Sequence, residues 1–153
     1  MGKYELRLKI NNARNRIEDL NYEIKKLHDR KDRFRSDLSK MSDRKTILVD
    51  FYDNKLSKAV ALQGVRGRAN STLRDKHVDV FSVGNKTSVE NNYAGIVGYI
   101  QKNINTADEK IEECRAEINR LEGDISYWEQ EIRNIEREEE EENARKQQLD
   151  NLR

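Results

Sequence analysis

The chain has 153 residues, enough for one domain, but 39% of them are charged and only 35% are apolar, which excludes a wide globular core. Proline is absent, and this favours long helices over disorder, because proline removes a helical hydrogen bond and clashes with the preceding turn. Residues 1–76 contain 20 Lys and Arg against 11 Asp and Glu (net +9), and residues 77–153 contain 10 against 18 (net −8). The two halves are therefore expected to pair with each other, and the interleaving of both signs disfavours nucleic-acid binding.

A first long helix is predicted over residues 2–63, because apolar side chains recur there at alternating steps of four and three. This spacing defines one seam along a helix, as in a coiled coil. Lys31 and Lys45 occupy seam positions, where a long aliphatic stem can lie along the seam while the ammonium reaches water. The other seam residues are Leu6, Ile10, Ala13, Ile17, Leu20, Ile24, Leu27, Phe34, Leu38, Met41, Leu48 and Tyr52.

A head segment is predicted over residues 64–90, after the helix breaks near Gly64 or Gly67. The stretch Val78–Val83 alternates as a strand would, and Gly84-Asn85 is a candidate hairpin turn. The stretch is too short and polar to form a sheet of its own, so we expect it to be a loop.

A second long helix is predicted over residues 91–142, followed by a tail over residues 143–153. Its seam is uninterrupted and rich in isoleucine, whereas the run Glu139–Glu142 is typical of a solvated or frayed end. The seam residues are Tyr93, Val97, Ile100, Ile104, Ala107, Ile111, Cys114, Ile118, Leu121, Ile125, Trp128, Ile132 and Ile135.

The two seams have matching lengths, and their helices carry opposite net charge. We therefore predict a single all-α domain over residues 1–153, an antiparallel two-helix coiled-coil hairpin with a partly irregular head segment. In that arrangement Leu6 lies near Ile135 and Leu48 near Tyr93. A parallel homodimer ranks second, because it would place basic residues beside basic residues along the first helix.

Residues with catalytic or metal-binding chemistry are few and scattered. His28 and His77 have no second ligand at coordinating spacing, and Cys114 falls on the seam, where a thiol acts as a small hydrophobe. We therefore predict that the protein is not an enzyme and has no cofactor or metal. There is no apolar N-terminal segment of the Sec type and no run of membrane-spanning length, so we expect a cytoplasmic protein without membrane insertion.

A candidate partner-binding surface lies near the end of the first helix, where apolar residues occupy more than one helical face. A two-helix hairpin covers only one stripe, so the remainder must meet either the head segment or another protein. The candidate contact residues are Ile47, Val49, Phe51, Tyr52 and Leu56.

The layout resembles the small helical proteins of type VII secretion, the WXG-type proteins and the small partners encoded beside LXG toxins. Leu62-Gln63-Gly64 stands where that superfamily has its Trp-x-Gly or Leu-x-Gly turn, with Leu62 and Gly64 matching the motif. Tyr127 and Glu131 match its Tyr-x-x-x-Asp/Glu export signal on the second helix. The chain departs from the pattern in its longer helices, its extended head and the absence of tryptophan from the turn.

The resemblance implies a targeting or chaperone-like partner that binds the helical N-terminal domain of an LXG toxin and is co-exported with it. It also allows a second small helical protein in the complex. One alternative is a prefoldin-like holdase, which the possible hairpin at Val78–Val83 favours. Another is a purely structural coiled-coil scaffold, for which a homo-oligomer is expected.

Overall fold

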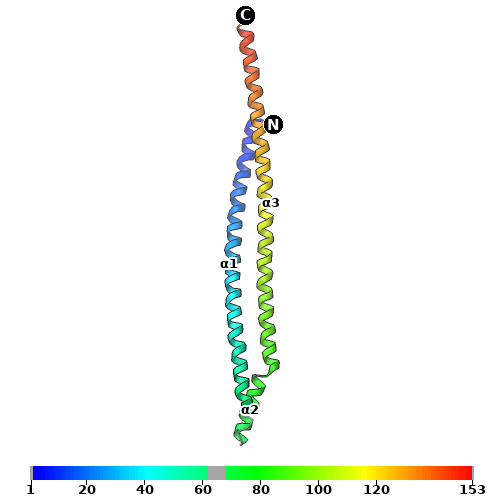
Figure 1. Ribbon diagram of the computed structural model, residues 1–153. Helices are drawn as coiled ribbons and strands as arrows, with labels where there is room; N and C mark the ends of the chain where they lie inside the picture. Colours follow the sequence, from blue (N-terminus) through cyan, green and yellow to red (C-terminus); the bar gives the residue numbers. More distant parts are fainter. Residues whose placement is uncertain (1, 62–67, 153) are drawn as a thin grey trace. The chain divides into compact units, whose positions relative to one another are not determined.

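The computed structural model describes residues 2–61 and 68–152, and within these ranges it contains helices and no strand. The helices are α1 (Lys3–Ala61), α2 (Arg68–Val80) and α3 (Val83–Asp150), as Figure 1 shows. The two long helices comprise 59 and 68 residues. They run without a break because the chain contains no proline and because each maintains one apolar seam against a partner. The predicted all-α class is confirmed.

The chain divides into two compact units, and each is an antiparallel arrangement of α1 and α3 segments. Unit 1 comprises Met1–His28 and Asp108–Arg153, and unit 2 comprises Asp29–Ala107. Since α1 passes from unit 1 to unit 2 and α3 returns in the opposite direction, the connectivity is that of the predicted helical hairpin.

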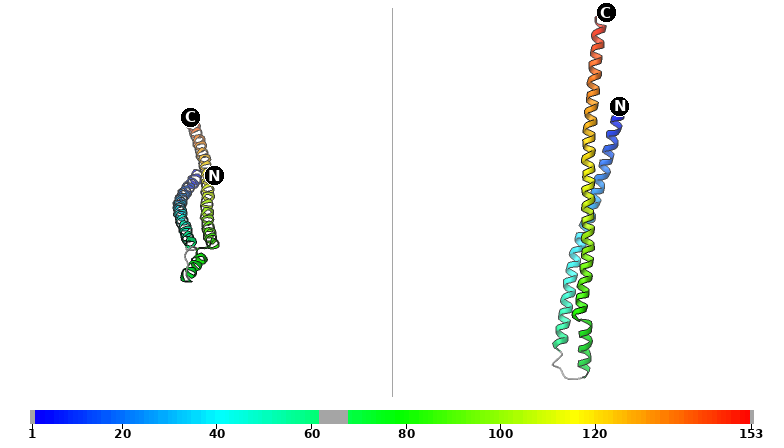
Figure 2. Two further views of the ribbon diagram at one scale, coloured as in Figure 1. Left: turned by 60° about the horizontal axis from the view of Figure 1, so that its bottom comes forward. Right: turned by 90° about the vertical axis from the view of Figure 1, so that its right-hand side faces the viewer.

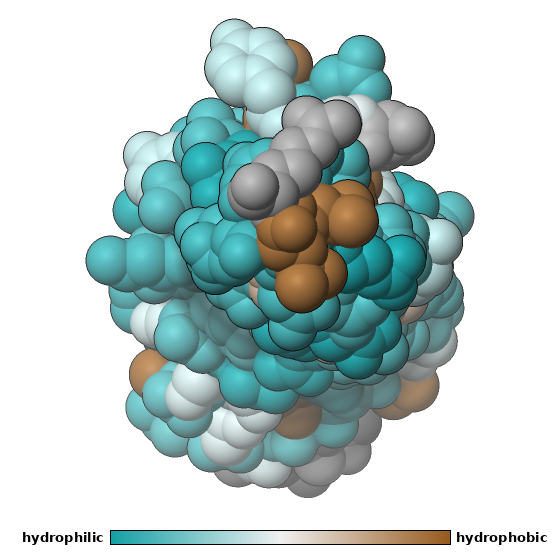
Figure 3. All heavy atoms as spheres, turned by 90° about the horizontal axis from the view of Figure 1, so that it is seen from above, coloured by the Kyte–Doolittle hydropathy of each residue, from teal (hydrophilic) through white to brown (hydrophobic). Residues whose placement is uncertain are grey.

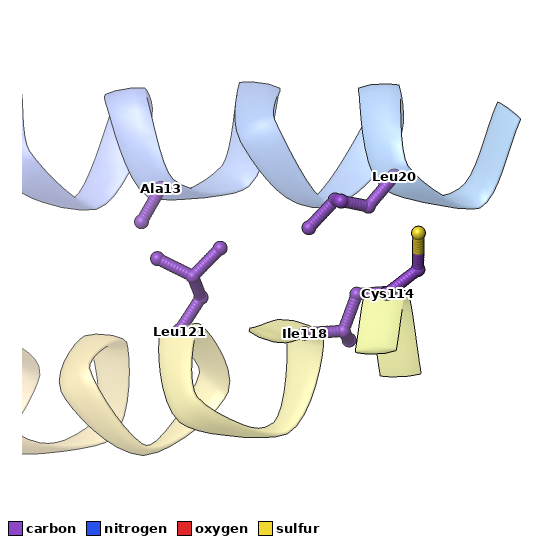
Figure 4. Packing of buried hydrophobic residues seen from close by; sticks show 5 residues of the cluster. All are labelled: Ala13, Leu20, Cys114, Ile118 and Leu121. Carbon is purple, nitrogen blue, oxygen red and sulfur yellow. The ribbon is translucent and has the colours of Figure 1, made fainter. Parts of the chain in front are cut away.

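The core of unit 1 lies on the predicted seam. A central cluster joins Ala13 and Leu20 of α1 to Cys114, Ile118 and Leu121 of α3, and these side chains point toward one another across the two helices (Figure 4). Ile17, Ile24, Ile125 and Trp128 pack against this cluster. The buried apolar side chains of the unit are Leu6, Ile10, Ala13, Leu20, Leu27, Ile111, Cys114, Ile118 and Leu121. Every one of them is a predicted seam residue, so the heptad interpretation is confirmed here.

Ion pairs flank this core, and they join basic residues of α1 to acidic residues of α3. The carboxylate of Glu117 accepts two hydrogen bonds from Arg16, at 3.0 Å from Nε and 3.3 Å from Nη2. The remaining pairs are Arg14–Glu129, Arg7–Glu136 and Lys3–Glu139. In each of the four pairs the cation comes from α1 and the carboxylate from α3, as the charge asymmetry of the sequence predicts.

Unit 2 uses the same seam with shallower burial. Ile100, Ile104 and Ala107 of α3 are buried, and so is Lys31 of α1, whereas Lys45 is exposed. The remaining predicted seam residues of this unit are half-buried: Phe34, Leu38, Met41, Leu48, Tyr52, Tyr93 and Val97. The helices pair here with less apolar material between them.

The expected loop at Val78–Val83 is wrong. Val78 to Val80 end α2, Val83 begins α3, and only Phe81 and Ser82 lie between the two helices. Figure 2 shows α2 as a separate short helix between the end of α1 and the start of α3. The second long helix therefore begins eight residues before the predicted position, and residues 68–80 of the predicted irregular head are helical.

Two side chains explain this local structure. The Ser82 hydroxyl accepts a hydrogen bond from the backbone N–H of Asn85, at 3.2 Å, which makes Ser82 the N-cap of α3. The amide Nδ2 of Asn85 donates to the carbonyl oxygens of Asp79 and Val80, both at 2.9 Å. Asn85 thus satisfies carbonyls at the end of α2, which have no partner within the helix. The pair ends one helix and starts the next within two residues.

The C-terminal residues continue α3 to Asp150, so the segment predicted as a tail is helical up to that residue. Beyond the ion pair between Lys3 and Glu139, α3 extends past the start of α1, as Figures 1 and 2 show. Pairs at i, i+4 spacing, Glu141 with Arg145 and Glu142 with Lys146, support this single helix. The first helix ends at Ala61 in the described residues, and the last two residues of its predicted range lie outside them.

Candidate protein-binding surface

The predicted partner-binding residues fall on α1 in unit 2 and differ in exposure. Ile47 is 70% exposed and Phe51 is 46% exposed, whereas Val49, Tyr52 and Leu56 are half-buried. The set is therefore not one uniform patch. Its exposed part is centred on Ile47 and Phe51, one turn apart on the same side of the helix.

An aromatic cluster covers part of the set from within the chain. Phe81 lies between α2 and α3, and its ring contacts both Phe51 (centroids 5.6 Å apart) and Tyr52 (5.4 Å) in edge-to-face geometry. Phe51 and Tyr52 are themselves 6.5 Å apart with interplanar angle 78°. Such pairs stabilise a fold by about 0.5–1.5 kcal/mol each beyond the area they bury. Of the two expected ways to cover the apolar residues near the end of α1, contact with the head segment is therefore the one found for Tyr52 and for one side of Phe51.

An apolar groove remains open on the other side. Ile47, Leu48 and Phe51 of α1 and Tyr93 of α3 line it, and Arg44 stands at its edge. Its volume is about 420 Å³. The Nζ atom of Lys55 lies 5.5 Å from the centroid of the Phe51 ring, so a second cation borders the same apolar surface.

The sequence predicts that Leu48 and Tyr93 lie near each other on the seam, and in the structure both line this groove. Sequence reasoning missed Tyr93 and Arg44 as groove residues. The signal for Tyr93 was a large ring at the first seam position of the second long helix, where two helices alone cannot enclose a tyrosine.

The residues of the candidate export signal lie on α3 in unit 1. Tyr127 is 61% exposed and Glu131 is half-buried, and their spacing of four places them one turn apart on the helix. The tyrosine ring is therefore accessible beside the seam residue Trp128, which packs against the core cluster. The candidate turn motif of Leu62 and Gly64 lies outside the described residues.

Two further apolar surfaces lie in unit 1. A groove of about 320 Å³ is lined by Ala13, Leu121 and Trp128, and Lys9 holds its Nζ 5.7 Å from the Trp128 ring centroid. At the C-terminal end of α3, Leu149 and Leu152 are 64% and 85% exposed. Figure 3, which views the molecule toward that end, shows a hydrophobic patch with hydrophilic surface on either side of it.

Of the residues with catalytic or metal-binding chemistry, Cys114 lies in the core of unit 1. Cys114 is buried in the core cluster, and burial raises the pKa of its thiol, with the carboxylates of Glu23 and Glu117 adding to the shift. Within residues 2–61 and 68–152, no three His, Cys, Asp or Glu side chains gather in a way that could hold a metal ion. None of the described helices has the length and apolar character needed to cross a membrane.

Comparisons with protein-family models, with curated proteins and with solved structures find no match to this chain.

Proposed function

We propose that the protein is a non-enzymatic helical partner that binds the helical N-terminal domain of an LXG-type toxin for type VII secretion. The observation that carries the proposal is the apolar groove of Ile47, Phe51 and Tyr93 on an all-helical hairpin. Grooves between helices accept a further amphipathic helix through anchors spaced three and four residues apart. A helical toxin domain would supply such a helix.

The role of Tyr127 and Glu131 in export belongs to the same proposal. Their position on the second long helix and the 61% exposure of Tyr127 support a signal that a secretion ATPase can contact without unfolding the hairpin. The protein would act in the cytoplasm and leave the cell with its partner.

The first experiment is co-purification of the untagged chain with the tagged N-terminal domain of each toxin-like protein encoded by a neighbouring gene. The mass of any complex is then determined. A stoichiometric complex supports the proposal. If the chain binds none of these domains and associates only with itself, the proposal is wrong.

The second experiment separates binding from export. Tyr127→Ala should abolish secretion of the complex while leaving its assembly intact. Tyr99→Ala is the matched control, because Tyr99 lies on the same helix and is 68% exposed. Equal secretion of the Tyr127 variant and the wild type would remove Tyr127 from the signal.

The structure weighs on the two alternatives differently. The holdase interpretation relied on a β-hairpin at Val78–Val83, and that feature is absent because these residues end α2 and begin α3. The scaffold interpretation is favoured by the continuous core of unit 1, in which every buried apolar residue lies on the seam. Sedimentation discriminates here, because a scaffold forms an elongated homo-oligomer whereas a toxin partner forms a heteromer.

A further inference from the structure

The groove of unit 2 lies on a helical face whose other members are all cations. Steps of four, three, four, four and three residues bring these positions to one side of α1. We name this face the basic–apolar stripe, and it consists of Lys40, Arg44, Ile47, Phe51, Lys55 and Lys58. Lys40, Arg44 and Lys58 are exposed and Lys55 is half-buried. Along the helix, the two apolar residues are therefore preceded by two cations, Lys40 and Arg44, and followed by two more, Lys55 and Lys58.

Two aspartates close to the stripe in sequence have surroundings of their own. Asp43 lines a separate groove, together with Lys45 and Val97. Asp53 accepts a hydrogen bond from Lys86 of α3 at 2.7 Å, and that bond raises the pKa of Lys86, with Asp50 contributing in the same direction. The ion pairs described within unit 2 join Asp32 to Arg35, Asp75 to Arg74 and Asp53 to Lys86, and none of them includes a cation of the stripe.

A second copy of the chain fits this face poorly. If two copies met antiparallel around Ile47 and Phe51, Arg44 of one copy would approach Lys55 of the other. A parallel pairing would place each cation beside its own counterpart. Juxtaposed like charges disfavour both arrangements, so the charge pattern selects a partner of opposite sign.

We propose that the groove binds one amphipathic helix of a partner protein, with an apolar stripe seated on Ile47, Phe51 and Tyr93 and flanked by Asp or Glu residues that face the four cations. The proposal rests on the proposed function in that this helix belongs to the toxin domain. Between Lys40 and Lys58 the stripe rises roughly 27 Å at 1.5 Å per residue, so a helix of about 20 residues matches it.

The charge selection is tested with two labelled peptides of about 20 residues, the length of the stripe. Both carry leucine at alternating spacings of three and four, and one has glutamate flanks where the other has lysine. Fluorescence anisotropy should show the glutamate peptide binding about tenfold or more tightly at low salt, with the difference shrinking at high salt as the exposed charges are screened. Equal binding, or tighter binding of the lysine peptide, overturns the proposal.

Two variants locate the site. Ile47→Asp should abolish binding of the glutamate peptide, whereas Leu8→Asp, at a 50% exposed leucine of α1 in unit 1, should leave it unchanged. The double variant Lys40→Glu with Arg44→Glu should remove the preference for the glutamate peptide, because the two new carboxylates offset the two cations that remain, Lys55 and Lys58. Its control is Lys102→Glu with Lys110→Glu, the same change of charge at two exposed positions of α3. Circular dichroism confirms that each variant remains helical.

The same variants distinguish this proposal from the proposed function. If the toxin domain binds the wild type and Ile47→Asp weakens that complex, both stand. If the toxin domain binds both proteins equally, the secretion role stands and the groove is the wrong site. If no toxin domain binds but the glutamate peptide does, the groove is a binding site for an acidic amphipathic helix, and the proposal that this helix belongs to a toxin is wrong. Self-association that Ile47→Asp abolishes would identify a second copy as the occupant and overturn the proposal.

Discussion

Leu20 offers the most direct test of the packing described for unit 1. Its side chain is 1% exposed and lies in the cluster with Ala13, Cys114, Ile118 and Leu121 (Figure 4). Replacing it by alanine removes buried methyl groups at the centre of the contact between α1 and α3. Cavity-forming substitutions of this kind destabilise proteins by about 2–5 kcal/mol.

The expected value lies near the lower end of that range. A two-helix core is a single layer with solvent on both flanks, so the helices can close partly around the space that the side chain leaves. We therefore expect Leu20→Ala to lower the free energy of unfolding by about 2–3 kcal/mol. For a chain of this length that corresponds to a fall in melting temperature of roughly 5–10 °C.

The assay is urea unfolding followed by circular dichroism at two protein concentrations, with linear extrapolation of the free energy to zero denaturant. Leu8→Ala is the matched control, since Leu8 lies on the same helix in the same unit and is 50% exposed. It should change stability by less than about 0.5 kcal/mol. Because both variants make the same substitution in a helix, their difference isolates burial from helix propensity.

Two results would refute this reasoning. If the two variants lose the same stability, the seam burial of Leu20 does not determine the fold in solution. If Leu20→Ala and Ile118→Ala are additive in the double variant, the two residues do not share a core, because side chains in contact show interaction energies of about 0.5 kcal/mol or more.

Three further predictions follow from local structure. Ser82→Ala removes the N-cap of α3 and should destabilise the protein by about 1 kcal/mol, whereas Ser82→Asp should retain most of the stability; equal urea midpoints for all three proteins would contradict the cap. Gly95→Ala and Gly98→Ala should each raise stability by about 0.5–1 kcal/mol, because an added Cβ meets no atom within 4 Å at either position; a lower melting temperature would show that these helix positions are packed in solution. The hydrogen bond from Arg16 lowers the pKa of Glu117 from 4.5. As the pH falls, the Glu117 carboxylate is therefore protonated at a higher pH in the unfolded chain than in the folded one. The stabilisation is therefore present above about pH 4.5 and is lost as the pH falls through the folded pKa, and the urea midpoints of wild type and Arg16→Gln should converge once the pH is below that folded pKa. A constant difference across that range would mean that the ion pair does not contribute.

The seams of both long helices could be predicted from the sequence, residue by residue. Alternating steps of four and three place Leu6, Leu20 and Ile118 on one side of their helices whatever the partner is, because helical periodicity is a local property of the chain. The opposite net charges of the two halves then indicated which helices pair. These features together determined the all-α hairpin.

The region between the helices was decided by contacts that no periodicity reveals. Val78 and Val80 alternate as in a strand, but a strand needs a neighbouring strand to satisfy its backbone, and the described residues contain none. Helices satisfy their own backbone groups, so this segment is helical on both sides of Ser82. The side chain of Asn85 then satisfies the carbonyls that the break leaves at the end of α2.

The candidate surface also depended on tertiary structure. The sequence identified Ile47 and Phe51 as apolar residues off the seam, and their side chains are exposed. Whether the head would cover them could not be predicted, because that depends on where a single ring, Phe81, comes to lie after the chain reverses. Local spacing determined which residues share a helical face, and the contacts of the Phe81 ring with Phe51 and Tyr52 decided which part of that face remains open.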